Sequence, residues 1–144
     1  MAVSDAMTAR IVSVRPEETV QVAIGKMLES EVASVAVCEQ DRLVGIFTER
    51  DVLRLAGEGT DFRTLPVGDV MTKQLYTVAP DDDLLDAAAL MQEKRIRHLP
   101  VLQDGNILGI LGIREVLRAL VERLWRLHDE RARETARDLL SRRA

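Results

Sequence analysis

The feature of this sequence that most restricts its fold is an internal duplication. When the 144-residue chain is shifted by 64 positions against itself, residues 3–54 align with residues 67–118 without a gap. The aligned stretches share 16 of 52 residues, whereas unrelated segments of ordinary composition would share about 3. Repeated units of this size bury their apolar faces against one another. We therefore expect two similar units that pack into one structure.

Each copy contains the same succession of patterns. Short β-rich runs at 11–14 and 75–78 are each followed by a proline. An amphipathic helix comes next, with Thr19 or Asp83 as its expected N-cap. Two apolar strands joined by a polar turn follow (35–38 with 43–47, and 99–102 with 107–111), and a second helix begins near Glu49 or Ile113. The sequence therefore predicts an α+β fold in which each unit is β-α-β-β-α.

The first helix of each copy has an apolar face that we expect to point inward. This face consists of Val20, Ala23, Ile24, Met27 and Leu28 in the first copy and of Leu84, Ala87, Ala88 and Met91 in the second. A single unit is too small to bury two helices and three strands well. We therefore expect face-to-face packing with pseudo-twofold symmetry. The sequence divides into repeat 1 (1–60), repeat 2 (61–118) and a C-terminal helical extension (119–144).

Composition and charge exclude several classes of protein. The net charge of −4 argues against nucleic-acid binding, which requires a basic surface. The single cysteine, Cys38, excludes an intramolecular disulfide, and its apolar neighbours predict a small buried residue rather than a reactive thiol. No apolar run approaches 18 residues and no signal peptide is recognisable, so we expect a cytoplasmic protein without a membrane segment.

Several motifs recur at corresponding positions of the two copies. They are V-S-D-A-M-T and V-G-D-V-M-T, S-V-R-P and T-V-A-P, R-H-L-P-V in the second copy, and the closing G-I-F-T-E-R-D-V-L and G-I-L-G-I-R-E-V-L. This combination resembles a tandem pair of CBS domains, the regulatory unit named after cystathionine β-synthase. The resemblance implies a stand-alone flat module (a Bateman module) with two clefts for adenosine-containing ligands. These ligands are AMP, ADP or ATP, or else NAD or S-adenosylmethionine, and such modules commonly form homodimers.

The closing motif of the first copy suggests chemistry on its own. Thr48 stands where a helix begins, so its hydroxyl and the first helical amides could meet a phosphate. Asp51 lies about one turn later and could accept both hydroxyls of a ribose. The alternative is that Thr48 only caps the helix and Asp51 only favours its dipole.

The resemblance implies that this motif faces the second copy across one cleft. The predicted nucleotide site consists of Ile46, Thr48, Arg50 and Asp51 with Leu75, Tyr76, Ile96, Arg97, His98 and Pro100. Ile46, Leu75 and Ile96 would sandwich a base, and Arg97 and His98 would offset phosphate charge. Alternatives stay open for three parts of this set. Arg97 and His98 could serve a helix C-terminus, Arg50 could lie at a dimer face, and Tyr76 could point away from the cleft.

The opposite cleft has diverged. Thr48 and Asp51 correspond to Gly112 and Glu115, and Arg97 and His98 correspond to Ala33 and Ser34. By position, this second cleft sets Gly112, Arg114 and Glu115 opposite Ile11, Val12, Ala33 and Ser34, without cations from the first copy. We therefore expect one strong adenine-nucleotide site per chain.

The C-terminal extension has no helix breaker. The sequence predicts one helix of about 28 residues from Ile113 onward, with an apolar stripe at helical spacing. The stripe consists of Leu117, Leu120, Val121, Leu124, Leu127 and His128. It could pack on its own module or a dimer mate, or it could dock a separate effector protein.

Three classes of function are to be weighed for this sequence: a regulatory module, an enzyme and a scaffold. The leading hypothesis is a regulatory module that binds an adenine nucleotide and signals to a partner protein. An enzyme is disfavoured because only two histidines occur, Cys38 is predicted to be buried, and no nucleophile is paired with a base. No metal-binding constellation is recognisable either. The remaining class is a nucleotide-free scaffold that acts through dimerisation and the C-terminal helix.

Overall fold

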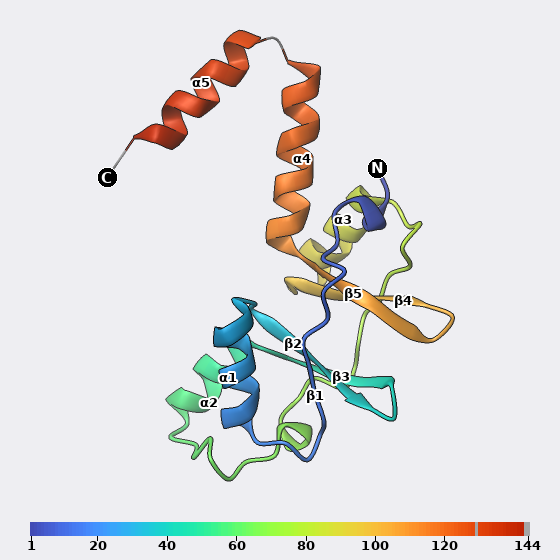
Figure 1. Cartoon of the computed structure of the whole chain (residues 1–144), viewed down its shortest axis with the longest axis vertical. Helices are drawn as coiled ribbons and strands as arrows, with labels where there is room; N and C mark the ends of the chain where they lie inside the picture. The colour runs from blue at the N-terminus through green and yellow to red at the C-terminus, as the bar shows by residue number, and fades with distance from the viewer. Residues whose placement is uncertain (129, 143–144) are drawn as a thin grey trace.

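The computed structural model describes residues 1–128 and 130–142, which form two similar α+β units and a helical extension (Figure 1). The first unit contains β1 (Ser13–Val14), α1 (Val20–Ser30), β2 (Ser34–Glu39), β3 (Arg42–Thr48) and α2 (Glu49–Gly57). The second contains α3 (Leu84–Lys94), β4 (His98–Gln103), β5 (Asn106–Gly112) and α4 (Ile113–Leu127). The predicted succession of elements is confirmed in the first unit, and the second differs only in its first strand.

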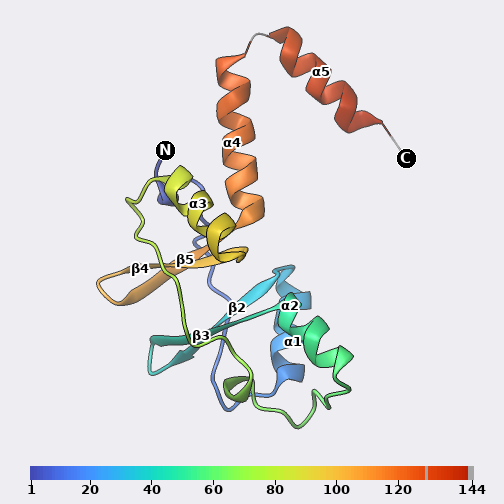
Figure 2. The same ribbon diagram turned by 180° about the vertical axis from the view of Figure 1, so that it is seen from behind.

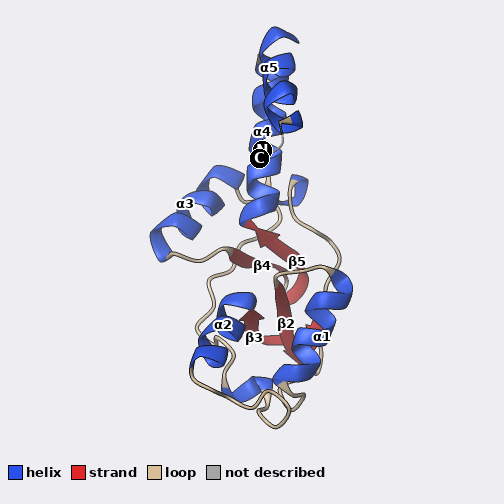
Figure 3. Ribbon diagram, turned by 90° about the vertical axis from the view of Figure 1, so that its left-hand side faces the viewer, coloured by secondary structure: helices blue, strands red, loops and turns tan. Residues whose placement is uncertain are grey.

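Local sequence signals place the helices and hairpins where they were predicted. The Thr19 side chain accepts a hydrogen bond from the Val22 amide at the start of α1, and Asp83 accepts one from the Leu85 amide at the start of α3. Both hairpins are antiparallel, pairing β2 with β3 and β4 with β5. The strands of the two units lie next to each other at the centre of the molecule, with the helices outside (Figure 3).

The first strand of each copy is shorter than predicted. In the first unit only Ser13–Val14 pairs in parallel with β2. In the second unit the run 75–78 forms no strand, and Val78 alone makes a parallel bridge to Val101. Val78 donates to the Pro100 carbonyl and accepts from the Leu102 amide, which is too little pairing for a ladder.

Each unit has its own apolar core, and each core takes a segment from the other copy. A short 3-10 helix, Val3–Asp5, places Val3 and Ala6 in the core of the second unit. The corresponding 3-10 helix, Val67–Asp69, places Val67 in the core of the first unit. The two copies therefore exchange their opening segments.

Backbone hydrogen bonds hold the exchanged segments with matching geometry. The Val3 amide donates to the Asp82 carbonyl, and the Val67 amide donates to the Glu18 carbonyl at the 64-residue offset. Further along, Thr8 bridges Ile110 on β5, and Thr72 bridges Ile46 on β3. Because each segment crosses to the opposite unit, neither core is complete without the other copy.

The predicted inward faces are correct except at one position. Val20, Ala23 and Met27 are buried in the first unit, and Leu84, Ala87 and Met91 are buried in the second. Leu28, however, is 74% exposed. It lies at the edge of the apolar stripe of α1, one position beyond the residues that reach the sheet.

Cys38 is half-buried in β2 rather than fully buried. Burial raises the pKa of its thiol, and the nearby Asp41 carboxylate raises it further. The thiol therefore stays protonated at neutral pH, which is the opposite of what a reactive cysteine requires.

The prediction of one uninterrupted C-terminal helix is wrong. Helix α4 ends at Leu127, where His128 adopts an extended backbone (ψ 156°), and α5 (Glu130–Ser141) continues at an angle to α4 (Figure 2). No glycine or proline marks this break, so no local pattern predicts it. The predicted extension also includes residues 129, 143 and 144, which lie outside the described residues.

The exchanged segments lie so close to two glycines that a methyl group added to either glycine would overlap them. A Cβ on Gly109 would overlap the Thr8 carbonyl oxygen, and one on Gly45 would overlap the Met71 side chain. We expect Gly109→Ala to destabilise the protein by about 1–3 kcal/mol, because backbone cannot move aside as a side chain can. Gly45→Ala should cost less, because the closest atoms belong to the flexible Met71 side chain and the nearest backbone atom, the Thr72 carbonyl oxygen, is 3.0 Å away.

Urea unfolding would measure both effects. Gly25→Ala is the matched control, because Gly25 is exposed on α1 with no atom near its added Cβ. There the change should stabilise the protein by about 0.5–1 kcal/mol through helix propensity. An equal response at Gly109 and Gly25 would contradict the close packing of the exchanged segments.

Candidate functional site

A large cavity of about 670 Å³ lies between the two units. One wall comes from the end of β3 and the first turn of α2, and the other from the segment that joins α3 to β4. Its lining residues are Ile46, Thr48, Glu49, Arg50, Asp51, Leu53, Thr72, Arg95, Ile96, Arg97 and His98. Because β3 and α2 belong to the first copy and 95–98 to the second, the cavity requires both copies.

The predicted pair Thr48 and Asp51 forms a compact polar corner of this cavity. Asp51 Oδ2 accepts from the Thr48 backbone amide at 2.9 Å and from the Thr48 hydroxyl at 3.2 Å. Asp51 Oδ1 faces Arg54 Nη2 at 3.4 Å, at the distant limit of a hydrogen bond. The pair therefore caps α2, as the structural alternative proposed. One carboxylate oxygen still has room for another donor.

The rest of the cavity combines apolar walls with charged side chains, in which three arginines outnumber the Glu49 carboxylate. Ile46 is buried and Ile96 is half-buried, so both present apolar surface to the space between them. Arg50 and Arg97 are exposed at the rim, one from each copy. An apolar interior with cations at its rim suits a ligand that has a flat apolar part and an anionic part.

Seven of the ten predicted site residues line the large cavity, and Leu75, Tyr76 and Pro100 do not. The Tyr76 ring lies under the Lys94 ammonium, 5.4 Å from the ring centroid, which agrees with the alternative that it points away. Pro100 is buried within β4, and its carbonyl accepts a hydrogen bond from the Val78 amide. Leu75 lies in the run that forms no strand, so its position relative to the cleft could not be derived from a strand register.

Four lining residues were missed from the sequence: Glu49, Leu53, Thr72 and Arg95. Thr72 arrives with the exchanged segment, and the repeated Met-Thr pair was the signal that could have identified it. Arg95 is the C-cap of α3 in the left-handed conformation (φ 55°), which turns it toward the cavity rim.

Arg97 and His98 do not serve the C-terminus of a helix. Helix α3 ends at Lys94, and His98 is already the first residue of β4. Burial lowers the pKa of the His98 imidazole, the Glu115 and Glu49 carboxylates oppose that shift, and the Arg97 guanidinium adds to it. The ring is therefore neutral at pH 7, whereas we expected from the sequence a cation that offsets phosphate charge.

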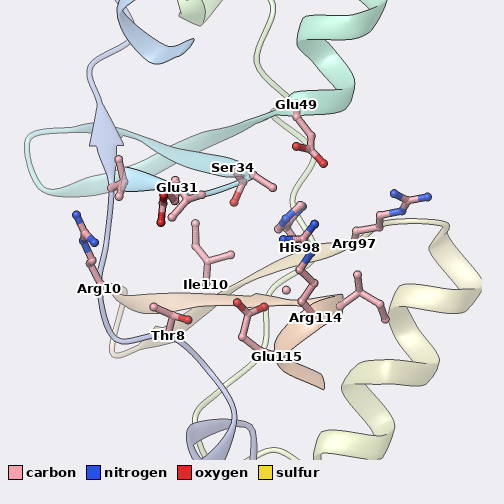
Figure 4. A pocket seen from close by; sticks show the side chains of 15 residues that line it. Thr8, Arg10, Glu31, Ser34, Glu49, Arg97, His98, Ile110, Arg114 and Glu115 are labelled. Carbon is pink, nitrogen blue, oxygen red and sulfur yellow. The ribbon is translucent and has the colours of Figure 1, made fainter. Parts of the chain in front are cut away.

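A second, smaller cavity of about 190 Å³ occupies the pseudo-equivalent position (Figure 4). It lies between the start of α4 and the first copy, as the sequence predicted, but it is not free of cations from that copy. Arg10 of the first copy lines it, which corrects the expectation. Its lining residues are Thr8, Arg10, Val12, Glu31, Val32, Ala33, Ser34, Glu49, Arg97, His98, Ile110, Gly112, Ile113, Arg114 and Glu115.

Glu115 explains part of the difference in size between the two cavities. A Cβ on Gly112 would overlap the Glu115 carboxylate, so this longer side chain folds back over the position that a threonine occupies in the first copy. The space open beside Thr48 and Asp51 is therefore occupied by protein in the second copy.

The part of the chain that the structure describes contains neither a metal-binding cluster nor a membrane-spanning helix. No group of three or more His, Cys, Asp and Glu side chains there could hold a metal ion. None of the helices in this part is both long and apolar enough to cross a membrane.

Comparisons with known proteins agree with the duplication. The CBS domain family model matches residues 3–58 and again residues 67–122. A CBS domain-containing protein, YhcV of Bacillus subtilis, is 37% identical over 113 residues, covering 78% of this chain and 80% of that protein. Both segments matched by the family model begin at an exchanged 3-10 helix. The first ends at residue 58, just after α2, and the second ends within α4.

Solved structures share the fold. The hexameric CBS-CP12 protein from bloom-forming cyanobacteria is 33% identical with a TM-score of 0.75, covering 81% of this chain and 69% of that one. The CBS domain pair of protein MJ0100, in complex with 5′-methylthioadenosine and S-adenosyl-L-methionine, has a TM-score of 0.79 over 85% of this chain and 98% of that one. At 18% identity, this last likeness concerns the fold alone.

The family matches span both copies of the repeat. The exchanged segments, the two hairpins and the paired cavities are all placed within the matched residues. The chain therefore belongs to the CBS domain family, as a tandem pair of CBS domains.

Proposed function

We propose that this chain is a regulatory module that binds one adenine nucleotide, of the AMP, ADP or ATP class, in the large cavity. NAD and S-adenosylmethionine are the further adenosine-containing candidates. Binding is transmitted to a partner protein. The observation that carries this proposal is that the two cavities differ in volume and in lining residues.

The size of each cavity matches its expected role. Sites for small organic ligands usually enclose about 300–1,000 Å³. The large cavity, at about 670 Å³, falls within that range, and the small cavity, at about 190 Å³, falls below it. The CBS domain pair of MJ0100, which has this fold, is in complex with two adenosine-containing molecules.

The residues around the large cavity supply a role for each part of a nucleotide. Ile46 and Ile96 would hold the base between them. Asp51 would accept the ribose hydroxyls through Oδ1, which pairs with Arg54 Nη2 at 3.4 Å and can accept further hydrogen bonds. Arg50 and Arg97 would pair with phosphate oxygens, for which the guanidinium group is well suited. Leu75, Tyr76 and Pro100 have no place in this arrangement.

The first prediction concerns stoichiometry and stabilisation. Calorimetry with AMP, ADP and ATP should give one tight site per chain for at least one of them. That nucleotide, at 100 times its Kd, should raise the free energy of unfolding by about 2.7 kcal/mol, because it binds only the folded state. Two equal sites would contradict the assigned asymmetry, and absence of any stabilisation would favour the nucleotide-free scaffold.

Asp51→Asn tests the assignment to this cavity. The amide keeps an oxygen to accept from the Thr48 amide, so α2 should remain capped, but the charge that favours the ribose hydroxyls is lost. We expect the affinity for the tightest nucleotide to fall about tenfold, equal to 1.4 kcal/mol, by calorimetry.

Asp83→Asn is the matched control for Asp51→Asn. Asp83 also accepts a hydrogen bond at the start of a helix, and it lines neither cavity. This variant should bind nucleotide like the unmodified protein. An equal loss in both variants would show that capping, rather than ligand contact, explains the effect.

The second candidate function, a scaffold that acts through dimerisation, is favoured by the surface of α4. Its apolar residues Ile113, Leu117, Leu124 and Leu127 are exposed by 43%, 62%, 52% and 71%. Their spacing of four, seven and three places them along one side of the helix. CBS-domain relatives form oligomers, as the hexameric CBS-CP12 protein shows. We propose that two copies of this chain pair through this side of α4, whether or not nucleotide is bound.

Light scattering would test this pairing. The unmodified protein should have twice the chain mass of 16.1 kDa. Leu124→Ser combined with Leu127→Ser should give the single-chain mass, because it removes apolar area from the proposed contact. Leu28→Ser, an equally exposed leucine on α1, should leave the mass unchanged. A dimer that survives the double substitution would place the contact elsewhere.

A further inference from the structure

His98 is one of three side chains that line both cavities. The other two are Glu49 and Arg97. Figure 4 shows its ring between Glu49, from the first turn of α2, and Glu115, from the first turn of α4. A group in this position can respond to charge placed in either cavity.

The electrostatic surroundings of His98 are mixed. The neighbouring backbone elements bring both signs of charge toward the two cavities. They contribute Glu49, Arg50 and Asp51 from α2, Arg114 and Glu115 from α4, Arg95 and Arg97 from the segment before β4, Arg10 from the N-terminal segment, and Glu31 at the end of α1. Among these, Glu115 and Glu49 favour the protonated ring and Arg97 opposes it.

Burial decides the balance when the large cavity holds no anion. A half-buried imidazole loses hydration when it is charged, and this loss outweighs the two carboxylates, so the pKa of His98 lies below its ordinary 6.5. The neutral ring has one N–H donor, whereas the protonated ring has two. Only the protonated ring can donate toward a ligand in the large cavity and toward a carboxylate on its other side.

We propose that His98 takes up a proton when a phosphate-bearing ligand enters the large cavity, so that ligand binding is linked to pH. This inference rests on the proposed function and specifies its regulation. A phosphate adds negative charge near a ring that already lies between two carboxylates, and the added attraction offsets the cost of burying the charge. The proton then allows His98 to bridge the ligand and the wall of the small cavity.

The chain is well suited to a direct test, because it contains only two histidines, His98 and His128. His128→Gln leaves His98 as the single imidazole, and His128 lies exposed at the end of α4. NMR titration of the ring signals of this variant would give the pKa of His98 with and without saturating ADP. We expect a value below 6.5 without ADP and a rise of at least one unit with it, equal to a tenfold preference of ADP for the protonated protein.

Calorimetry with ADP between pH 8.0 and pH 5.5 provides the second readout. His98→Gln is the matched variant, because its amide can donate one hydrogen bond but cannot titrate. Since the phosphate of ADP also titrates in this range, the comparison is the ratio of affinities between unmodified protein and variant at each pH. That ratio should rise about tenfold as the pH falls, because only the unmodified protein gains a proton at this position.

In the ligand-free protein, lowering the pH acts in the opposite direction: it weakens stability, whereas it strengthens ADP binding. Because the folded state holds the pKa of His98 below the unfolded value, protons bind the unfolded chain more tightly. The contribution of His98 to stability is therefore complete above pH 6.5 and is lost as the pH falls through 6.5 toward the folded value. Saturating ADP should reduce or reverse this loss in thermal unfolding, and His98→Gln should remove it.

The outcomes separate the two proposals. Binding of ADP with an unchanged pKa of His98 would overturn the proton linkage and leave the proposed function intact. Absence of binding by ADP, AMP and ATP at every pH would overturn the proposed function, and the linkage with it. If His98→Gln fails to fold, the titration of His128→Gln still decides the linkage, because that protein retains His98.

Discussion

The structure depends on the exchange of the opening segments between the two copies. Val3 and Ala6 complete the core of the second unit, and Val67 completes the core of the first. The exchange works only where the crossing backbone can lie directly against a strand, which Gly45 and Gly109 allow. Two units joined in this way cannot separate without exposing both cores, so the clefts between them are fixed features of the fold rather than gaps between independent domains.

Duplication and divergence then explain why the two cavities at corresponding positions differ. The backbone provides the same strand-to-helix corner twice, at the start of α2 and of α4. In the first copy, Thr48 and Asp51 leave open space beside a short carboxylate. In the second, Glu115 fills the corresponding space over Gly112. Symmetry therefore sets the positions of the cavities, and a few side chains set their size and charge. His98, which lines both, gives them a common wall.

Much of this fold could be predicted because the repeat doubles every local signal. Caps at Thr19 and Asp83, paired hairpins, and helices starting at Glu49 and Ile113 follow from residue types at fixed spacing. The exchange of segments could not be predicted, because an apolar residue such as Val3 carries no signal of which core it enters. The break at His128 could not be predicted either, because no glycine or proline lies where the backbone becomes extended.

The candidate site was predicted best where it depends on local geometry and worst where it depends on neighbours. The positions of Thr48, Asp51 and Arg97 follow from a strand-to-helix junction and from pairing the copies. Tyr76 contacts Lys94 instead, and the charge state of His98 depends on burial that no sequence pattern reports. The most direct test is a crystal structure of the protein grown with ADP. We expect one nucleotide per chain in the large cavity, with its ribose at Asp51 and its phosphates near Arg97 and His98. Nucleotide in the small cavity, or ADP bound outside both cavities, would contradict this expectation.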